Sequence, residues 1–207
     1  MLNLRVRPAV NRVVDPVAGG LLRAGVSPDA VTVAGTVAAV TASLVLLPRG
    51  AFVLGPALIT LAVLTDLLDG AMARRRPRPS LFGAWLDSTC DRVADAAIFS
   101  GLALWFAGDG DDRLLLSLVL FCLVSGAVVS YAKARAEGLG LRCDVGLAER
   151  AERLILVLGG VALAGLGLDA ALAVALWLLA AASAVTVVQR LLEVRRQATA
   201  RDAGPAS

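Results

Sequence analysis

The sequence predicts an all-α integral membrane protein with six transmembrane helices and an N-terminal interfacial amphipathic helix. Of its 207 residues, 58% are hydrophobic and only 18% are charged, and the mean hydropathy is +0.78. A soluble domain is about 45–50% apolar and about 25% charged. The apolar excess is gathered in long runs, which approach the ~20 residues that a bilayer crossing needs. We expect spans at roughly 31–47, 51–73, 84–107, 113–136, 151–168 and 170–192.

Basic residues cluster on one side of this arrangement. They precede the first span, separate the second from the third and the fourth from the fifth, and follow the sixth. The alternate connections hold only Arg49 and Arg113. Because Lys and Arg mark the cytoplasmic side, we expect a multi-pass protein of the cell membrane with both termini and the segment 66–91 facing the cytoplasm.

The chain is expected to form one domain, residues 1–196, followed by a disordered tail at 197–207. Within the domain, residues 1–24 would form a juxtamembrane helix and residues 29–193 the six-helix bundle. Residues 3–22 alternate basic or polar residues with apolar ones. This pattern is typical of a helix that lies on a leaflet, although a disordered basic arm stays open as an alternative.

The ends of the first two spans carry recognisable signals. Ser27 or Asp29 can cap the first span, and Pro28 fits its first turn. Residues 48–50, Pro-Arg-Gly, predict a tight outer turn. The prolines of RRRPRPS, residues 74–80, prevent the second span from continuing as a helix.

The third span carries Asp87, Asp91 and Asp95 at positions i, i+4 and i+8, which form one acidic stripe. Facing lipid, each aspartate would cost about 2.5–3.5 kcal/mol even on insertion scales. The stripe must therefore face the bundle interior or a polar cavity. We interpret Asp95 as a partner for a buried base or backbone group.

A second acidic pair, Asp66 and Asp69, lies on one helical face at the end of the second span. With Asp87 and Asp91 it brings together four carboxylates, whose repulsion must be relieved by protonation or by bound cations. Hard divalent cations prefer such oxygen ligands. A zinc site is not expected, because the chain has no His and its three cysteines show no CxxC spacing. Without His, any proton transfer falls to carboxylates.

These residues fit a known pattern. The spacing Asp66-x2-Asp69-Gly70-x2-Ala73-Arg74-x8-Gly83-x3-Asp87-x3-Asp91 resembles the complete signature of the CDP-alcohol phosphatidyltransferases. The segments PDAVT, LDSTCDR, SYAKARAEGLGLR and ERAERL are similar to the actinobacterial phosphatidylinositol phosphate synthases of that family. The resemblance extends over the six-span topology, from about residue 4 to 196.

The resemblance implies two metal ions per active site. Asp66, Asp69 and Asp87 would hold the first, and Asp66, Asp87 and Asp91 the second. Magnesium is the expected ion, with manganese as an alternative, because Mg²⁺ is usually held by carboxylates and substrate phosphates. Asp91 would also be the catalytic general base that deprotonates the attacking alcohol.

The same resemblance implies a binding site for CDP-diacylglycerol. Gly70 would let the cytidine phosphate approach the helix, although plain helix packing is the alternative explanation for this glycine. The basic residues Arg75, Arg76 and Arg78 are better explained by attraction to anionic lipids. The residues expected at the CDP-diacylglycerol site are Asp29, Ala30, Val31, Thr32, Asp69, Gly70, Ala73, Arg74 and Ser80.

An acceptor that carries a phosphate needs further cations, and Lys133, Arg153 and Arg190 lie at the cytoplasmic ends of spans four, five and six. The resemblance implies that they bind the acceptor phosphate. Positive-inside topology alone would also place bases there, and Arg195 stays open as an alternative to Arg190.

The expected activity is therefore transfer of a phosphatidyl group from CDP-diacylglycerol to 1D-myo-inositol 3-phosphate, in a homodimer within membrane lipids and with no nucleic-acid partner. Two alternatives stay open. One is a phosphatidylglycerophosphate synthase that uses glycerol 3-phosphate. The other, a divalent-cation transporter, would place its carboxylates near the bilayer midplane rather than at the cytoplasmic boundary.

Overall fold

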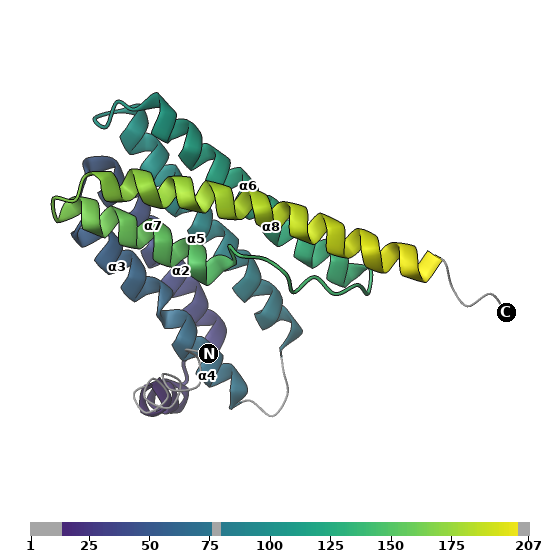
Figure 1. The fold of residues 1–207 in the computed structure, drawn as a ribbon. Coiled ribbons are helices and arrows are strands. Elements are labelled where there is room, and N and C mark those ends of the chain that lie inside the picture. The colour runs from purple at the N-terminus through teal and green to yellow at the C-terminus, as the bar shows by residue number, and fades with distance from the viewer. Residues whose placement is uncertain (1–13, 76–79, 203–207) are drawn as a thin grey trace.

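A computed structural model describes residues 14–75 and 80–202. Within these ranges all regular secondary structure is helical (Figure 1). Residues 14–23 form a helix that precedes the labelled elements. The elements that follow are α2 (Pro28–Leu46), the 3₁₀ turn η1 (Leu47–Arg49), α3 (Leu54–Val63), α4 (Thr65–Arg74), α5 (Leu81–Ala107), α6 (Arg113–Gly138), α7 (Arg150–Gly165) and α8 (Ala170–Asp202).

Side-chain caps set where three of these helices begin. The Ser27 hydroxyl accepts a hydrogen bond from the backbone N–H of Ala30 at 3.1 Å and caps α2, with Pro28 in its first turn. Ser80 caps α5 by accepting from Gly83 N–H at 2.9 Å. Asp112 caps α6, where its carboxylate accepts from two backbone N–H groups. Each cap satisfies N–H groups that have no partner inside the helix.

Four helical segments in the described ranges are long and apolar enough to cross a membrane: 28–49, 54–74, 113–138 and 170–202. The other two expected spans, which correspond to α5 and α7, are not among these four segments, and the reason differs between them. Helix α5 has 27 residues, but its acidic stripe and Arg92 lower its hydropathy. Helix α7 has only 16 residues, a length of about 24 Å. The all-helical prediction is confirmed, whereas the number of six spans is not.

The second expected span, 51–73, is not one helix. It is interrupted at Leu64, where α3 ends and α4 begins. The Thr65 hydroxyl donates to the carbonyl of Ala62 at 2.6 Å at this point, and Gly35 of α2 lies so close that a Cβ there would clash with Thr65. The first aspartate pair therefore lies on a short helix of its own, packed against α2.

The C-terminal tail is a correction to the sequence analysis. Residues 197–202 are not disordered but continue α8, which runs beyond the rest of the bundle (Figure 1). The reason is tertiary: the Gln197 side chain bonds both the N–H and the carbonyl of Arg142, and Arg201 donates to the carbonyls of Leu139 and Gly140. Residues 203–207 lie outside the described ranges.

The N-terminal helix is described only from residue 14, and residues 1–13 lie outside the described ranges. Its Ala18 is fully buried against Ala71 and Met72 of α4. Asp15 forms an ion pair with Arg75 at 3.4 Å. This helix therefore packs against the same short helix that carries the first aspartate pair.

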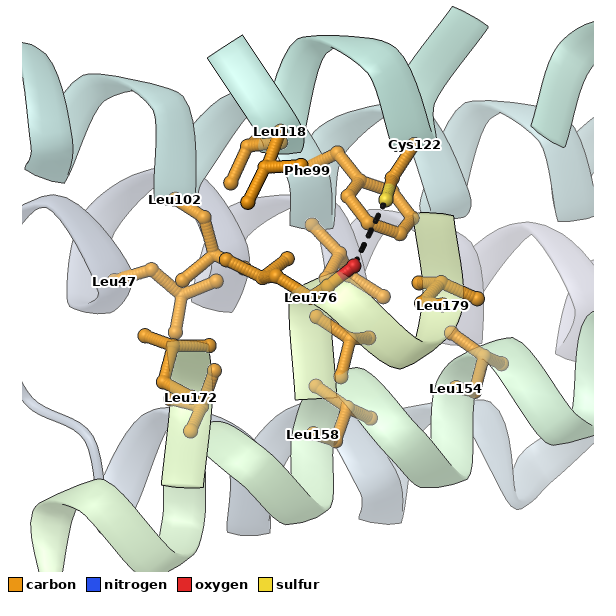
Figure 2. Close-up of a cluster of buried hydrophobic side chains, with 14 of the residues drawn as sticks. Leu47, Phe99, Leu102, Leu118, Cys122, Leu154, Leu158, Leu172, Leu176 and Leu179 are labelled. Carbon is orange, nitrogen blue, oxygen red and sulfur yellow. Dashed lines mark hydrogen bonds between the residues drawn. The ribbon is translucent and has the colours of Figure 1, made fainter. Parts of the chain in front are cut away.

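An apolar core joins α5, α6, α7 and α8 (Figure 2). Phe99 and Leu102 of α5 meet Leu176 and Leu179 of α8, all nearly or fully buried. The Cys122 thiol of α6 lies 3.8 Å from the carbonyl oxygen of Leu176 as a weak donor. Because this core fixes α5 against α7 and α8, their polar ends are brought to one side of the molecule.

Helices α2 and α5 approach closely at Gly101. A Cβ at this position would lie 2.3 Å from the carbonyl oxygen of Ser43, and backbone cannot give way as a flexible side chain can. We expect Gly101→Ala to lower the free energy of unfolding by about 1–3 kcal/mol, the range for overpacked sites. Thermal unfolding in detergent measures this. The matched control is Gly159→Ala in α7, where a Cβ would meet nothing within 4 Å; an equal loss in both variants would contradict the packing argument.

Candidate active site

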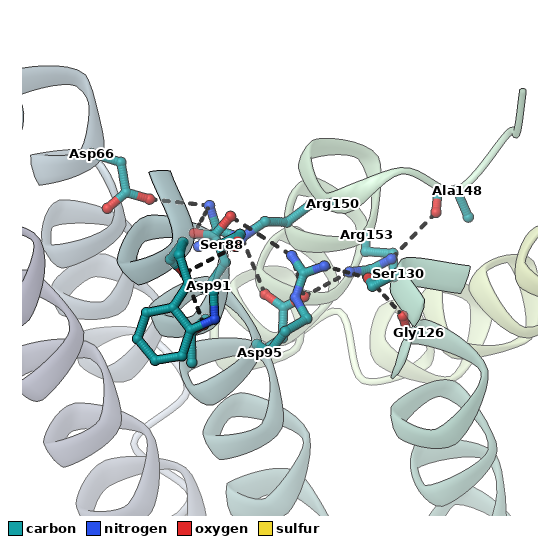
Figure 3. A network of polar contacts seen from close by, with 12 residues as sticks. Asp66, Ser88, Asp91, Asp95, Gly126, Ser130, Ala148, Arg150 and Arg153 are labelled. Carbon is teal, nitrogen blue, oxygen red and sulfur yellow. Dashed lines mark hydrogen bonds and ion pairs between the residues drawn. The ribbon is translucent and has the colours of Figure 1, made fainter. Parts of the chain in front are cut away.

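Asp66 of α4 meets Asp91 and Asp95 of α5 at the first turn of α7 (Figure 3). Arg150, the first residue of α7, reaches both sides. Its Nη1 lies 3.0 Å from Asp66 Oδ2 and 2.8 Å from Asp91 Oδ1, and its Nε lies 3.3 Å from Asp95 Oδ1. One guanidinium therefore joins three carboxylates from two helices.

Sequence reasoning did not assign Arg150 to the site. In the sequence, Arg150 is one of the bases between the expected fourth and fifth spans. The available signal was its spacing from Arg153, because residues three apart lie on one helical face. That spacing does not say which carboxylates the face meets.

Arg153 extends the network inward. Its Nη2 lies 2.6 Å from Asp95 Oδ2, its Nη1 donates to the carbonyl of Ala148 at 3.4 Å, and the residue is 2% exposed. Arg92 of α5 adds ion pairs to Asp91 and Asp95 at 3.7 and 4.0 Å. Three arginines thus balance three aspartates. The expectation that Asp95 partners a buried base is confirmed.

Asp69 is held separately, by the head of α2. It is buried, and its Oδ2 accepts a hydrogen bond from the Thr32 hydroxyl at 2.5 Å. This contact ties α2 to α4 across 37 positions of sequence. It also places one expected metal ligand beside one residue expected at the CDP-diacylglycerol site.

A cavity of about 350 Å³ opens between α2, α4 and the start of α5. Of the residues expected at the CDP-diacylglycerol site, all line it except Ala30 and Val31, which lie on other faces of the first turn of α2. Asp87 lines it as well. Among the described residues, the lining is Pro28, Asp29, Thr32, Asp69, Gly70, Ala73, Arg74, Ser80, Gly83, Ala84 and Asp87.

Gly70 faces this cavity rather than another helix. Within residues 14–75 and 80–202, a Cβ built there would meet only the Arg74 guanidinium, at 3.4 Å. Close helix packing therefore does not account for the glycine. Its missing side chain leaves room in the cavity beside Arg74.

The three bases expected at the acceptor phosphate are already engaged. Lys133 Nζ lies 2.8 Å from Asp144 Oδ1, and this hydrogen bond holds the pKa of the exposed Asp144 carboxyl below its ordinary value of 3.8. Arg190 is 3% exposed, donates to the carbonyls of Val145 and Val129, and pairs with Glu149 at 3.6 Å. Arg153 is paired with Asp95, as described above. The structure does not bring the three together as free cations.

The donor set suits a hard divalent cation, since it consists of carboxylate oxygens at one end of two helices. No group of three or more acidic, His or Cys residues in residues 14–75 and 80–202 lies close enough to hold a metal as the side chains stand. Arg150 lies between Asp66 and Asp91 and contacts one oxygen of each (Figure 3). The carboxylates are of the type that binds a divalent metal, and the two oxygens that Arg150 contacts are Asp66 Oδ2 and Asp91 Oδ1.

Comparison with known proteins identifies the class. The model of the CDP-alcohol phosphatidyltransferase family matches residues 25–198. The chain therefore belongs to this family. Among its relatives is the phosphatidylinositol phosphate synthase of Streptomyces avermitilis, 50% identical over 214 residues, with all of this chain and 88% of the relative covered. The phosphatidylinositol phosphate synthase of Mycobacterium marinum is 51% identical, with 91% of this chain and 82% of the relative covered.

Solved structures agree with the sequence relatives. The phosphatidylinositol phosphate synthase of Mycobacterium tuberculosis with CDP-DAG bound superposes with a TM-score of 0.86 at 49% identity, covering 88% of this chain and 94% of that chain. The same enzyme in complex with manganese and citrate has a TM-score of 0.84 at 49% identity, covering 87% of this chain and 88% of that chain. The shared fold extends over nearly all of both chains.

Asp95 lies outside the family signature, yet three arginines converge on it. We expect Asp95→Asn to lower the free energy of unfolding by about 3 kcal/mol, because it leaves the charge of buried Arg153 without its partner. Thermal or denaturant unfolding in detergent measures this. Asp169→Asn, at an exposed position between α7 and α8, is the control and should leave the melting temperature unchanged. A variant at Asp95 as stable as the wild type would show that the network does not stabilise the fold.

Proposed function

We propose that this protein transfers the phosphatidyl group of CDP-diacylglycerol to 1D-myo-inositol 3-phosphate, with release of CMP. The observation that carries the proposal is the cavity between α2, α4 and α5, which gathers most of the signature residues beside the metal-type carboxylates. The names of the relatives support the choice of acceptor.

CDP-diacylglycerol is proposed to place its pyrophosphate in this cavity. Arg74 lies at the cavity wall next to Gly70, so a phosphate can reach the guanidinium where a larger side chain would block it. An arginine suits this role because its guanidinium can bond two phosphate oxygens at once. The related structure with CDP-DAG bound supports a site for this lipid in the shared fold.

Asp66, Asp69, Asp87 and Asp91 are proposed to hold two Mg²⁺ ions, with Mn²⁺ as an alternative. When bound, the ions neutralise charge on the phosphates and on the leaving CMP. Asp91 is proposed to accept the proton of the attacking acceptor hydroxyl. The Thr32 hydroxyl fixes the orientation of Asp69 at the edge of the cavity. The related structure with manganese supports a divalent ion in this fold.

The acceptor phosphate is proposed to bind Lys133, Arg153 and Arg190. Of these, Lys133 has the most accessible side chain, and its Asp144 partner is exposed and ionised. An incoming phosphate can therefore replace Asp144 without burying an unpaired charge. The side chains of Arg153 and Arg190 are buried, and their positive charge would attract the acceptor phosphate from inside the bundle.

The proposed setting is the cell membrane, with both termini and the cavity on the cytoplasmic side. Helices α5 and α7 would complete six crossings beside the four apolar segments, since both are packed into the same bundle. A homodimer is proposed as the assembly. The one-sided distribution of Lys and Arg supports the orientation.

The test of the proposed function is CMP release by purified protein with CDP-diacylglycerol and Mg²⁺. Inositol 3-phosphate, free inositol and glycerol 3-phosphate are compared as acceptors. We expect turnover with inositol 3-phosphate alone. Turnover with glycerol 3-phosphate instead would reassign the acceptor to that of a phosphatidylglycerophosphate synthase. CMP from none of the three would contradict the proposed activity.

Lys133 and Asp144 allow a paired test of the acceptor site. Lys133→Gln should raise the acceptor KM about tenfold or more, the effect of losing a charge-assisted hydrogen bond of about 1.5–3 kcal/mol. Asp144→Asn should lower the acceptor KM by a smaller factor, because it removes the anion that competes for Lys133. The KM for CDP-diacylglycerol is the internal control and should stay constant in both. Equal effects on the two substrates would contradict the assignment.

A further inference from the structure

Arg150 contacts the two carboxylates that link α4 to α5. The same nitrogen, Nη1, lies 3.0 Å from Asp66 and 2.8 Å from Asp91. The side chain is 22% exposed, so these contacts are well shielded from water. A guanidinium in this position neutralises part of the repulsion between the two acids.

Asp66 and Asp91 are also carboxylates that the proposed function assigns to the metal. The oxygens that accept from Arg150 are Asp66 Oδ2 and Asp91 Oδ1, and both contact its Nη1. A divalent cation bound to the same oxygens would lie against a positive guanidinium, and like charges at such distances repel strongly. Arg150 and the metal therefore compete for these two oxygens.

We propose that Arg150 is an internal counter-cation that competes with the divalent metal for Asp66 and Asp91, so that metal binding and departure of Arg150 from these carboxylates are one event. The inference rests on the proposed function for the identity of the metal ligands. It adds a positioning role for a residue outside the family signature.

The surroundings allow Arg150 to move while its neighbour stays. Its Nε also bonds Asp95 at 3.3 Å, and Asp95 is not among the proposed metal ligands. Arg153, in contrast, is fixed by Asp95 at 2.6 Å and by the Ala148 carbonyl, and its side chain is 3% exposed. Asp95 can therefore remain a partner of Arg150 when Asp66 and Asp91 bind a metal cation. Arg153, through its own contact with Asp95, keeps the first turn of α7 in place.

Mn²⁺ binding without substrates tests the proposal directly. Electron paramagnetic resonance counts free Mn²⁺ during titration of the full-length protein in detergent. We expect Arg150→Gln to bind Mn²⁺ about tenfold more tightly than the wild type, because the competing cation of a shielded pair is gone. Arg142→Gln is the matched control. It removes one positive charge from the connection that precedes α7. The hydrogen bonds between Gln197 and Arg142 involve only the backbone of Arg142, so the substitution leaves them in place. The Mn²⁺ affinity of Arg142→Gln should therefore equal that of the wild type.

Thermal unfolding gives a second readout. In EDTA, Arg150→Gln should melt below the wild type, because three carboxylates lose a shared partner, and its rise in melting temperature with Mn²⁺ should be larger. Mn²⁺ affinity in Arg150→Gln that is unchanged or weaker overturns the proposal. If that variant does not survive purification, Arg150→Lys replaces it, since one ammonium cannot reproduce both the Nη1 and Nε contacts; it should also bind Mn²⁺ more tightly, and no tightening overturns the proposal.

The outcome is separable from that of the proposed function. Asp87→Asn should lose Mn²⁺ binding while the wild type retains it. A wild type that binds no Mn²⁺ would contradict the metal assignment itself. Wild-type binding that Asp87→Asn abolishes, with no tightening in Arg150→Gln, would contradict only the role of Arg150.

Discussion

The paired burial of Asp95 and Arg153 is the constraint on which the polar end of the bundle depends. A single buried charge at either position would be strongly destabilising, whereas the pair at 2.6 Å is tolerated. This contact requires the Asp95 turn of α5 and the first turn of α7 to lie at the same level along the bundle. Arg150 on the same turn then reaches Asp91 and, across to α4, Asp66. The network joins the three helices that carry the proposed chemistry.

Close helix contacts at glycines make this convergence possible. Gly101 lets α5 approach the backbone of α2, and Gly35 lets α2 approach the point where α3 passes into α4. Small residues serve this purpose in membrane helices because lipid gives apolar side chains no preference for each other. The same closeness brings Thr32 onto Asp69. The cavity wall is therefore a product of backbone approach and not of large side chains.

The site divides into two halves that are built differently. The half formed by α2 and α4 is a cavity bounded by capped helix ends and by Gly70. The other half contains Lys133 and Arg190, whose acidic partners belong to the connection 139–149. Arg190 and Thr186 of α8 hold this connection through its backbone carbonyls and N–H groups. The end of α8 contacts the same connection, through Gln197 on Arg142 and through Arg201 on Leu139 and Gly140. It supports the segment that leads into Arg150 and Arg153.

The sequence by itself determined the all-helical class, the signature aspartates, most of the residues around the cavity and the need of Asp95 for a partner. The helical class and the need of Asp95 for a partner follow from composition, from spacing within one helix and from the cost of a charge in an apolar setting, all of which are local. The signature and the residues around the cavity follow from the resemblance to the family. Only the tertiary structure decided that Arg150 lies between Asp66 and Asp91, that the second span breaks at Leu64, and that residues 197–202 remain helical. Each of these depends on a contact between segments far apart in the chain, and a periodic pattern places a residue on a face without saying what that face meets.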